Sequence, residues 1–256
     1  MKALVKIGGS LLDDAASRTN LAKQIAAVAA SGIALTVVHG GGKQMTRFLE
    51  ERGVKSNFVR GLRVTTEETI DAVLKVLAGT VNTQLVASLA AEGARAVGLT
   101  GMDAGLALST FLDPELGFVG KVESSDSRLL NLLTSAGYLP VTACIGGGAN
   151  GEIFNVNGDS MAVAVASGWK ADKLVFLTDV PGVMDADRNI LPVLTVADCN
   201  RLIETGVATG GMQAKLNAAT MAVMNGVEEV RIVRGSDPNI VTQVFAGQAS
   251  GTKVVA

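Results

Sequence analysis

Two glycine-rich segments follow short apolar runs, and the first of them carries a lysine. Residues 6–10 read KIGGS and follow the run 3–5, and residues 39–42 read HGGG and follow the run 34–38. Because glycine has no Cβ, backbone N–H groups in such turns can approach a ligand closely. Helix N-termini favour negative charge, and Lys6 adds a mobile cation. These residue types indicate phosphate chemistry.

Four further charged residues stand where they could meet a ligand, although each has an ordinary structural explanation. Arg63 lies in a predicted strand or turn, either as an edge charge or as a clamp for a carboxylate. Asp159 precedes a predicted helix and could be an N-cap, and Asp179 at a strand end could be a turn former. Lys215 lies on a helix and, like most lysines, could simply be solvated.

Two common nucleotide motifs do not account for the glycines. The P-loop pattern GxxxxGK[ST] is absent, since Gly42 and Lys43 lack the upstream glycine and the following hydroxyl. The pattern GxGxxG occurs at Gly146, Gly148 and Gly151, but the residues after it look extended, where a dinucleotide site needs a helix. The sequence therefore argues against a P-loop enzyme and a nicotinamide-dependent oxidoreductase.

Strand and helix patterns alternate along the chain. Near-continuous apolar runs suit parallel strands that are covered on both faces. The alternation predicts an α/β fold with an open, mainly parallel sheet and helices on both sides, whose ligands lie beyond the carboxyl ends of the strands. The predicted strands are 3–7, 34–38, 94–99, 139–143, 173–178, 229–233 and 252–255, and the predicted helices are 20–31, 43–52, 127–136, 160–167, 196–204 with Thr195 as cap, and 212–225.

Several irregular segments interrupt this alternation. Residues 58–64 look like half of a hairpin, 65–68 read as a capping box that opens a long helix to about residue 92, and 101–122 read as a hairpin excursion. Residues 129–151 carry no charge, but polar residues, glycines and a proline divide them into helix, turn and strand rather than a membrane span. Residues 168–171 are a predicted hinge between two lobes.

The composition excludes several classes of protein. Lys and Arg number 22 against 24 Asp and Glu, and aromatics are 4%, so no basic surface for nucleic acid is expected. Cys144 and Cys199 lack metal or disulfide spacing, which predicts reduced, buried thiols. The single His39 cannot build a metal cluster and is expected to order the glycine loop. We expect a cytoplasmic protein without a membrane segment.

Taken together, the motifs resemble the amino acid kinase family, and within it the members that phosphorylate N-acetyl-L-glutamate. The resemblance covers residues 2 to about 254, in the order of the family. KxGG indicates only the broad family, whereas GLRVT together with NVNxD is much more specific. The matching segments are KIGGS at 6–10, HGGG at 39–42, GLRVT at 61–65, LAGTVN at 77–82, VGLTG at 97–101, NVNGD at 155–159, TDVPGV at 178–183 and GGMQAK at 210–215.

The resemblance implies a three-layer αβα sandwich with a lobe at 1–170 for the acyl amino acid and dimerisation, and a lobe at 171–256 for ATP. Lys6 and Lys215 would stabilise the transferring phosphoryl group, and Asp159 would orient them. Arg63 and Asn155 would hold the α-carboxylate and the acylated nitrogen of the substrate. Backbone donors would come from Gly8, Gly9, Gly41 and Gly42, and the nucleotide site would be lined by Asp179, Val180, Gly182, Val183, Met184, Thr209 and Gly210.

The implied reaction moves the γ-phosphoryl group of ATP, with Mg²⁺ bridging the phosphates, to the side-chain carboxylate of N-acetyl-L-glutamate in arginine synthesis. A glutamate-like carboxylate titrates near 4.3, so no general base is required. Succinylated glutamate or carrier-bound aminoadipate as acceptor, and a non-catalytic nucleotide-binding regulator, are the alternatives. Gly158 departs from the alanine common in relatives. The short N-terminus predicts a homodimer without the arginine-responsive hexamer.

Overall fold

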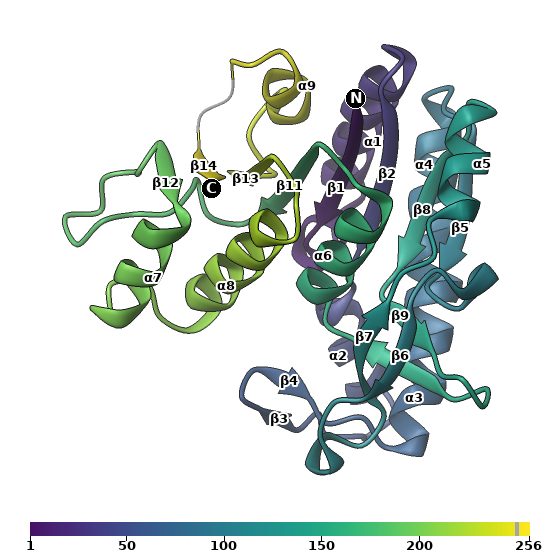
Figure 1. Ribbon diagram of the computed structural model, residues 1–256. Coiled ribbons are helices and arrows are strands. Elements are labelled where there is room, and N and C mark those ends of the chain that lie inside the picture. The colour runs from purple at the N-terminus through teal and green to yellow at the C-terminus, as the bar shows by residue number, and fades with distance from the viewer. Residues whose placement is uncertain (249–250) are drawn as a thin grey trace.

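A central sheet with helices on both faces forms the protein (Figure 1). The computed structural model describes residues 1–248 and 251–256. Neighbouring strands are parallel except β13 and β14, which are antiparallel. The eight strands lie in the order β12 (Val193–Thr195), β14 (Thr252–Val255), β13 (Glu229–Arg234), β11 (Lys173–Thr178), β1 (Lys2–Ile7), β2 (Ala34–His39), β8 (Leu139–Ala143) and β5 (Ala96–Thr100). The predicted open, mainly parallel sheet is confirmed.

The helices divide between the two faces of this sheet. On one face α1 (Ala15–Ala30) contacts both α4 (Thr83–Ala91) and α9 (Ile240–Phe245). On the other face α6 (Gly158–Trp169) packs on β1 and β11 and against α8 (Gly210–Met224), which contacts α7 (Val196–Glu204). The remaining helix of this side, α5 (Arg128–Ser135), packs on β2 and β8. These layers bury most residues of β1, β2, β8 and β11, whereas the edge strands β5 and β12 are more exposed.

The register of the central strands brings the glycine turns together. Lys6 lies between Val38 of β2 and Phe176 of β11, and Ile7 lies beside His39 and Leu177. The segments after β1, β2 and β11 therefore leave the same edge of the sheet side by side. Since the chain runs from β1 to β2 on one side and reaches β11 on the other, this edge is a topological switch point, where open α/β sheets bind ligands.

Smaller elements surround this edge of the sheet. β3 (Phe58–Val59) and β4 (Leu62–Arg63) pair as an antiparallel hairpin, so the segment predicted as half of a hairpin contains both halves. The predicted excursion at 101–122 holds the antiparallel pair β6 (Leu108–Phe111) and β7 (Val119–Ser124). These two strands join β9 (Ile145–Gly147) and β10 (Ile153–Val156) in a second, closed sheet.

The start of the long helix differs from the prediction. Thr66, not Thr65, is the N-cap, and its hydroxyl accepts from the Thr69 N–H, so the expected capping box is wrong. Thr65 is fully buried and its hydroxyl donates to the Arg63 carbonyl instead. The helical stretch then runs through α3 (Glu67–Val73), a π-helical segment (Leu74–Asn82) and α4.

Two segments could be considered as membrane spans, namely this helical stretch and the uncharged segment 129–151. Residues 67–91 are long and apolar enough to cross a membrane by length and composition alone. Leu85 and Leu89 of α4 are fully buried, and the helix packs on α1 and β5 as a layer of the fold. Residues 129–151 divide into α5, β8 and β9, as predicted.

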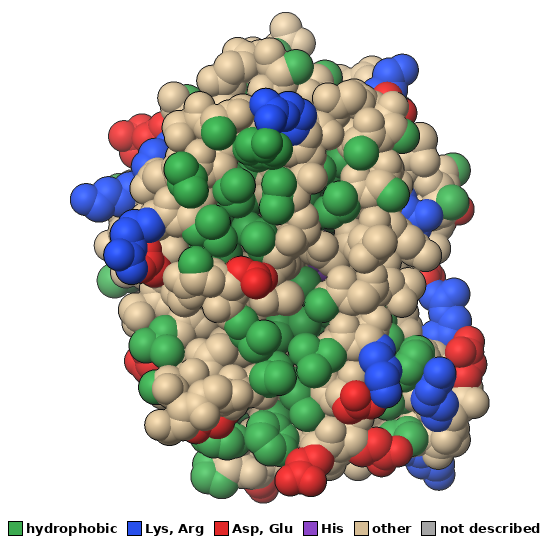
Figure 2. Space-filling view, turned by 90° about the vertical axis from the view of Figure 1, so that its right-hand side faces the viewer, with side chains coloured by type: hydrophobic (Ala, Val, Ile, Leu, Met, Phe, Trp, Pro, Cys, Tyr) green, Lys and Arg blue, Asp and Glu red, His purple; other side chains and the backbone are tan. Residues whose placement is uncertain are grey.

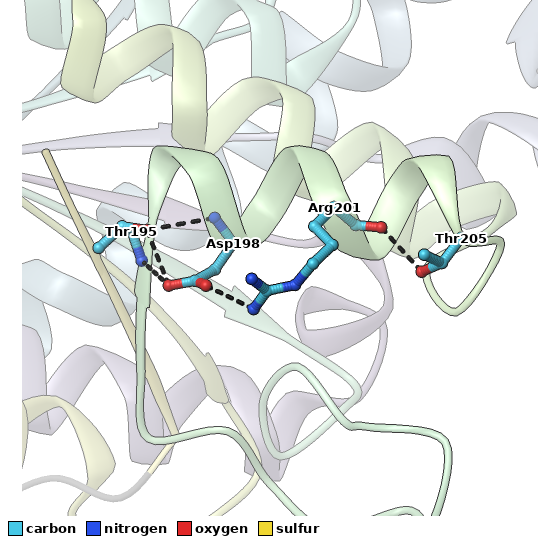
Figure 3. A network of polar contacts seen from close by, with 4 residues as sticks. All are labelled: Thr195, Asp198, Arg201 and Thr205. Atoms are coloured by element: carbon cyan, nitrogen blue, oxygen red, sulfur yellow. Dashed lines mark hydrogen bonds and ion pairs between the residues drawn. The ribbon is translucent and has the colours of Figure 1, made fainter.

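Helix α7 follows its predicted start. The Thr195 hydroxyl accepts from the Asp198 N–H at 3.1 Å, and the Asp198 carboxylate accepts from the Thr195 N–H at 3.0 Å (Figure 3). Arg201 donates to the same carboxylate at 2.6 Å, and the Thr205 hydroxyl donates to the Arg201 carbonyl. This reciprocal cap satisfies donors that a helix start otherwise leaves unpaired, and it fixes the element before the turn that carries Thr209 and Gly210.

The predicted hinge lies where α6 gives way to β11. Lys170 ends α6 in the left-handed conformation, with φ 55° and ψ 54°. After this turn β11 hydrogen-bonds directly to β1, so residues on both sides of position 170 share one sheet. The division into two lobes at this point stays a prediction.

Candidate active site

An ion pair lies at the centre of the site. The Lys6 ammonium is 2.6 Å from the Asp159 carboxylate, and the two side chains are only 12% and 15% exposed. Lys6 comes from the end of β1, and Asp159 from the first turn of α6, whose N-cap is Asn157. Asp159 is therefore not the N-cap that its sequence position allowed. The expected partnership between Lys6 and Asp159 is present.

Two glycine turns pack directly on one another beside this pair. A Cβ at Gly9 would lie 2.9 Å from the backbone nitrogens of Gly41 and Gly42, so no side chain fits between the turns. Outside the helices and strands of the described residues, no backbone acceptor takes the N–H groups of Gly9, Gly41 or Gly42. Gly8 differs, because its N–H donates to the Leu177 carbonyl at 3.1 Å. Gly8 joins β1 to β11 and does not supply the backbone donor that we expected.

His39 orders the second turn, as predicted. It is fully buried, and its Nδ1 lies 2.9 Å from the Gly40 carbonyl while its Nε2 lies 2.9 Å from the Asn82 amide nitrogen. Burial lowers the pKa of His39 to about 4, against the smaller opposite effect of the Gly40 carbonyl. The ring is thus neutral near pH 7, donates from Nδ1 and accepts at Nε2. The π-helical segment supplies Asn82, whose amide also donates to the Val141 carbonyl.

Arg63 is a buried cation with unused donors. It is 9% exposed, and burial lowers its pKa while the charge of Glu50 raises it. The two Nη2 hydrogens go to the Gly42 carbonyl and the Thr46 hydroxyl, and one Nη1 hydrogen goes to the Ser56 hydroxyl. No carboxylate lies within 4.0 Å among the described residues. A guanidinium has five N–H groups, so Nε and one Nη1 hydrogen remain for a ligand.

A cavity of about 170 Å³ collects the predicted substrate residues, since Gly41, Gly42, Arg63 and Asn155 all line it. The Asn155 amide donates to the Thr65 hydroxyl at 3.0 Å, which fixes its orientation toward β4. Apolar side chains from the π-helical segment and β7 complete the walls, including Leu77 and Val119. The cavity combines a cation, an amide and an apolar wall, which suits an acylated amino acid.

Cys144 also lines this cavity. It is 4% exposed, and burial raises the pKa of its thiol to about 11, so the group is a neutral thiol near pH 7. Cys199 is buried and free as well. The predicted reduced, buried thiols are confirmed.

Asp179 and Lys215 lie together on the other side of β1. The Thr178 hydroxyl donates to the Asp179 carboxylate at 3.0 Å and lowers the pKa of that carboxyl. The positive charges of Lys215 and Lys43 lower it further. Lys215 is half-buried on α8 and makes no ion pair within 4.0 Å among the described residues. The charge of Lys215 thus reaches the carboxyl end of β11, where Asp179 lies, and β11 pairs with β1, the strand that carries Lys6.

The other predicted nucleotide residues fall into two groups. Val180, Met184, Thr209 and Gly210 are half-buried or exposed, whereas Gly182 and Val183 are buried. The Val183 side chain is fully buried and its N–H donates to the Thr252 hydroxyl, so it supports the loop from within. A Cβ at Gly182 would meet that hydroxyl at 2.9 Å.

Sequence reasoning missed some supporting residues. Gln44 donates to the Gly9 carbonyl at 3.0 Å, and Asn82 fixes His39. The motif LAGTVN contained Asn82, but nothing in its spacing indicated a partner far away in the chain. Gln44 is the second residue after the HGGG turn, and that position was the available signal.

Comparison with known proteins identifies the family. The model of the amino acid kinase family matches residues 1–234. Acetylglutamate kinase from Solibacter usitatus is 58% identical, covering 100% of this chain and 99% of its own, and the one from Acidobacterium capsulatum is 42% identical over 100% of both. The crystal structure of smu.665 from Streptococcus mutans UA159 superimposes with a TM-score of 0.86 at 28% identity, covering 100% of this chain and 98% of that one. The chain belongs to the amino acid kinase family.

Proposed function

We propose that this protein is an ATP-dependent acetylglutamate kinase of arginine biosynthesis. The observation that carries the proposal is the cavity in which Gly41, Gly42, Arg63 and Asn155 meet. Gly158 lines the same cavity, and its Cβ position lies 3.3 Å from the Lys6 side chain, so the acceptor space adjoins Lys6. Full-length relatives that carry the name acetylglutamate kinase support the assignment.

The physical task of such an enzyme is to bring a carboxylate against a polyphosphate. In the proposed complex, Arg63 uses its two remaining donors on the α-carboxylate, and Asn155 meets the acylated nitrogen. The side-chain carboxylate then points toward Lys6 and the unpaired N–H groups of Gly9 and Gly41. Preorganised donors and cations stabilise charge on the phosphoryl group in flight, and this positioning supplies most of the catalysis in phosphoryl transfer.

The nucleotide is proposed to lie over the carboxyl end of β11, near Asp179 and the start of α8. Lys215 would approach the phosphoryl group from this side, opposite Lys6. Among the described residues no three His, Cys, Asp or Glu side chains gather as a metal site. Mg²⁺ would therefore take most of its ligands from phosphate oxygens and water, as it commonly does, and would supply charge neutralisation between the phosphates.

A homodimer is the proposed assembly, formed through the edge of the sheet at β5. That strand pairs only with β8 among the described strands. Figure 2, which faces this side of the molecule, shows hydrophobic side chains gathered over its centre. Exposed large hydrophobics of the elements here include Met102, Leu108 and Leu132, at 38%, 39% and 66% exposure. A bare strand edge with an apolar surround favours pairing with a second copy.

The predicted lobes and compartment belong to the same proposal. Residues 1–170 would bind the acyl amino acid and form the dimer, and residues 171–256 would bind ATP. A biosynthetic reaction that consumes ATP fits the cytoplasm, which is the compartment we propose.

The test is release of ADP by the purified full-length chain with Mg²⁺, ATP and N-acetyl-L-glutamate, with hydroxylamine to trap the acyl phosphate. We expect turnover and a hydroxamate product. N-succinyl-L-glutamate, carrier-bound aminoadipate and free glutamate are assayed in parallel. Faster turnover with another acceptor would replace the proposed substrate, and ATP binding without any turnover would favour a regulator.

A further inference from the structure

Lys43 is a charged residue beside the proposed site, and neither the KIGGS motif nor the HGGG motif includes it. It lies in the first turn of α2 (Gly42–Glu50), directly after the HGGG turn, and its side chain is exposed. It lines an open depression of about 640 Å³ together with Gly9, Gly42 and Arg63. Gly42 and Arg63 also line the smaller acceptor cavity. Lys43 therefore stands at the mouth of the space in which the acceptor is proposed to bind.

The charges around this depression leave Lys43 without a partner. Asp13 lines the depression, but it is paired with Arg47. Glu50 is the other acidic residue of the lining, and neither it nor any other described carboxylate lies within 4.0 Å of the Lys43 ammonium. Lys6, in contrast, is neutralised by Asp159. An exposed ammonium beside unpaired backbone N–H groups is a site for an anion.

Lys43 also lies within electrostatic reach of the nucleotide side of the site, since its charge lowers the pKa of Asp179. Its charge and that of Lys215 both act on Asp179, which stands at the end of β11. α2 follows β2, and α8 lies beyond β11, so the two lysines come from opposite sides of β1. An anion between them would lie above the Gly9 turn.

We propose that Lys43 is a third cation of the site and that its ammonium contacts the γ-phosphate of bound ATP. This inference rests on the proposed function. The γ-phosphate is the part of the nucleotide that must lie next to the acceptor, and Lys43 lines the depression that shares Gly42 and Arg63 with the acceptor cavity. A lysine suits the role because its compact charge sits on a flexible stem and can follow the phosphoryl group.

The proposal predicts that Lys43 strengthens the binding of nucleotides that carry a γ-phosphate and has little effect on the binding of those that lack it. We compare binding of AMP-PNP and ADP, each with Mg²⁺, by calorimetry for the parent protein, Lys43→Ala, Lys43→Arg and the control Lys23→Ala. Lys23 is exposed on α1 and has no ion pair among the described residues. We expect Lys43→Ala to weaken AMP-PNP about tenfold, the scale of one charge-assisted hydrogen bond, with ADP affinity within about twofold. Lys43→Arg should recover most of the loss, and Lys23→Ala should match the parent.

Equal weakening of both nucleotides, or no weakening of AMP-PNP, would overturn the assignment. Steady-state kinetics add a second readout, in which Lys43→Ala should raise the KM for ATP and leave the KM for the acceptor unchanged. A raised acceptor KM with unaltered AMP-PNP binding would move Lys43 to the acceptor and also refute the inference. If the parent protein turns over no acyl amino acid, the proposed function fails, yet the binding comparison still decides the role of Lys43.

Discussion

Removing the charge of Glu229 should destabilise the protein without impairing its chemistry. Its carboxylate binds Lys173 and Lys253 at 3.0 Å and Arg231 at 2.8 Å, and so ties β11, β13 and β14 together. Glu229 begins β13, at the edge of the sheet opposite the glycine turns. In Glu229→Gln three cations would surround a neutral amide.

The magnitude follows from the pKa of Glu229. Partial burial opposes its ionisation, but hydrogen bonds from Arg231, Lys173 and Lys253 outweigh this and lower the pKa from 4.5 to about 2. That difference corresponds to about 3 kcal/mol. Water reaches the cluster, since the Glu229 and Lys253 side chains are 16% and 33% exposed, so screening reduces the expected loss to about 2 kcal/mol. For a chain of this size the melting temperature should fall by about 4–8 °C.

Thermal unfolding at several pH values is the assay. Above pH 4.5 the carboxylate is ionised in both folded and unfolded chains, so the full difference between parent and variant is present. As the pH falls from about 4.5 toward 2, the unfolded chain binds the proton first, and the parent loses its advantage. Glu228→Gln is the matched control, because Glu228 is exposed and has no ion pair among the described residues. A melting temperature of Glu229→Gln within 1 °C of this control at pH 7, or a gap that persists unchanged at about pH 2, would refute the reasoning.

Four further substitutions test the site. Lys6→Ala and Lys215→Ala should each lower kcat by roughly 10²–10³, the cost of one preorganised electrostatic contact, and a parent-like kcat would remove that lysine from catalysis. Arg63→Ala should mainly raise the KM for the acyl amino acid, because its contact is equal in ground and transition states; steady-state kinetics with an unchanged KM would contradict this. Gly158→Ala should lower kcat by no more than about threefold, or about 0.7 kcal/mol in the barrier, because the new Cβ would lie 3.3 Å from Lys6 Cε and Lys6 must shift slightly within its ion pair with Asp159; a kcat that falls tenfold or more in steady-state kinetics would contradict this.

Strands were predictable where a local pattern determines them. Residues 139–143, 173–178 and 252–255 were predicted with the observed bounds, because each is a short run rich in apolar and β-branched residues. α1 was less accurate, since it begins at Ala15 rather than Asn20, with Asp14 as its N-cap. The polar residues of its first turns hid the start from a search for apolar periodicity.

The cap of the long helix shows what local sequence cannot decide. Thr65 and Thr66 are both competent caps by residue type. Thr65 is withdrawn from that role because its hydroxyl serves the Arg63 carbonyl and the Asn155 amide. Asn155 comes from a strand of the second sheet, so the choice between the two threonines depends on a tertiary contact. The same contact orients the side-chain amide of Asn155, which is proposed to meet the substrate.

The motifs alone indicated phosphate chemistry, but they did not show which cations of the proposed site lack a carboxylate partner. Lys6 has its own carboxylate, whereas Arg63, Lys43 and Lys215 have none within 4.0 Å among the described residues. A fold selected only for stability would pair a buried guanidinium such as Arg63, since an uncompensated buried charge is costly. In the proposed site these unpaired cations instead come together from segments far apart in the chain. Only the strand register, with β1 between β2 and β11, brings the segments after these three strands to one edge of the sheet, where the site is proposed.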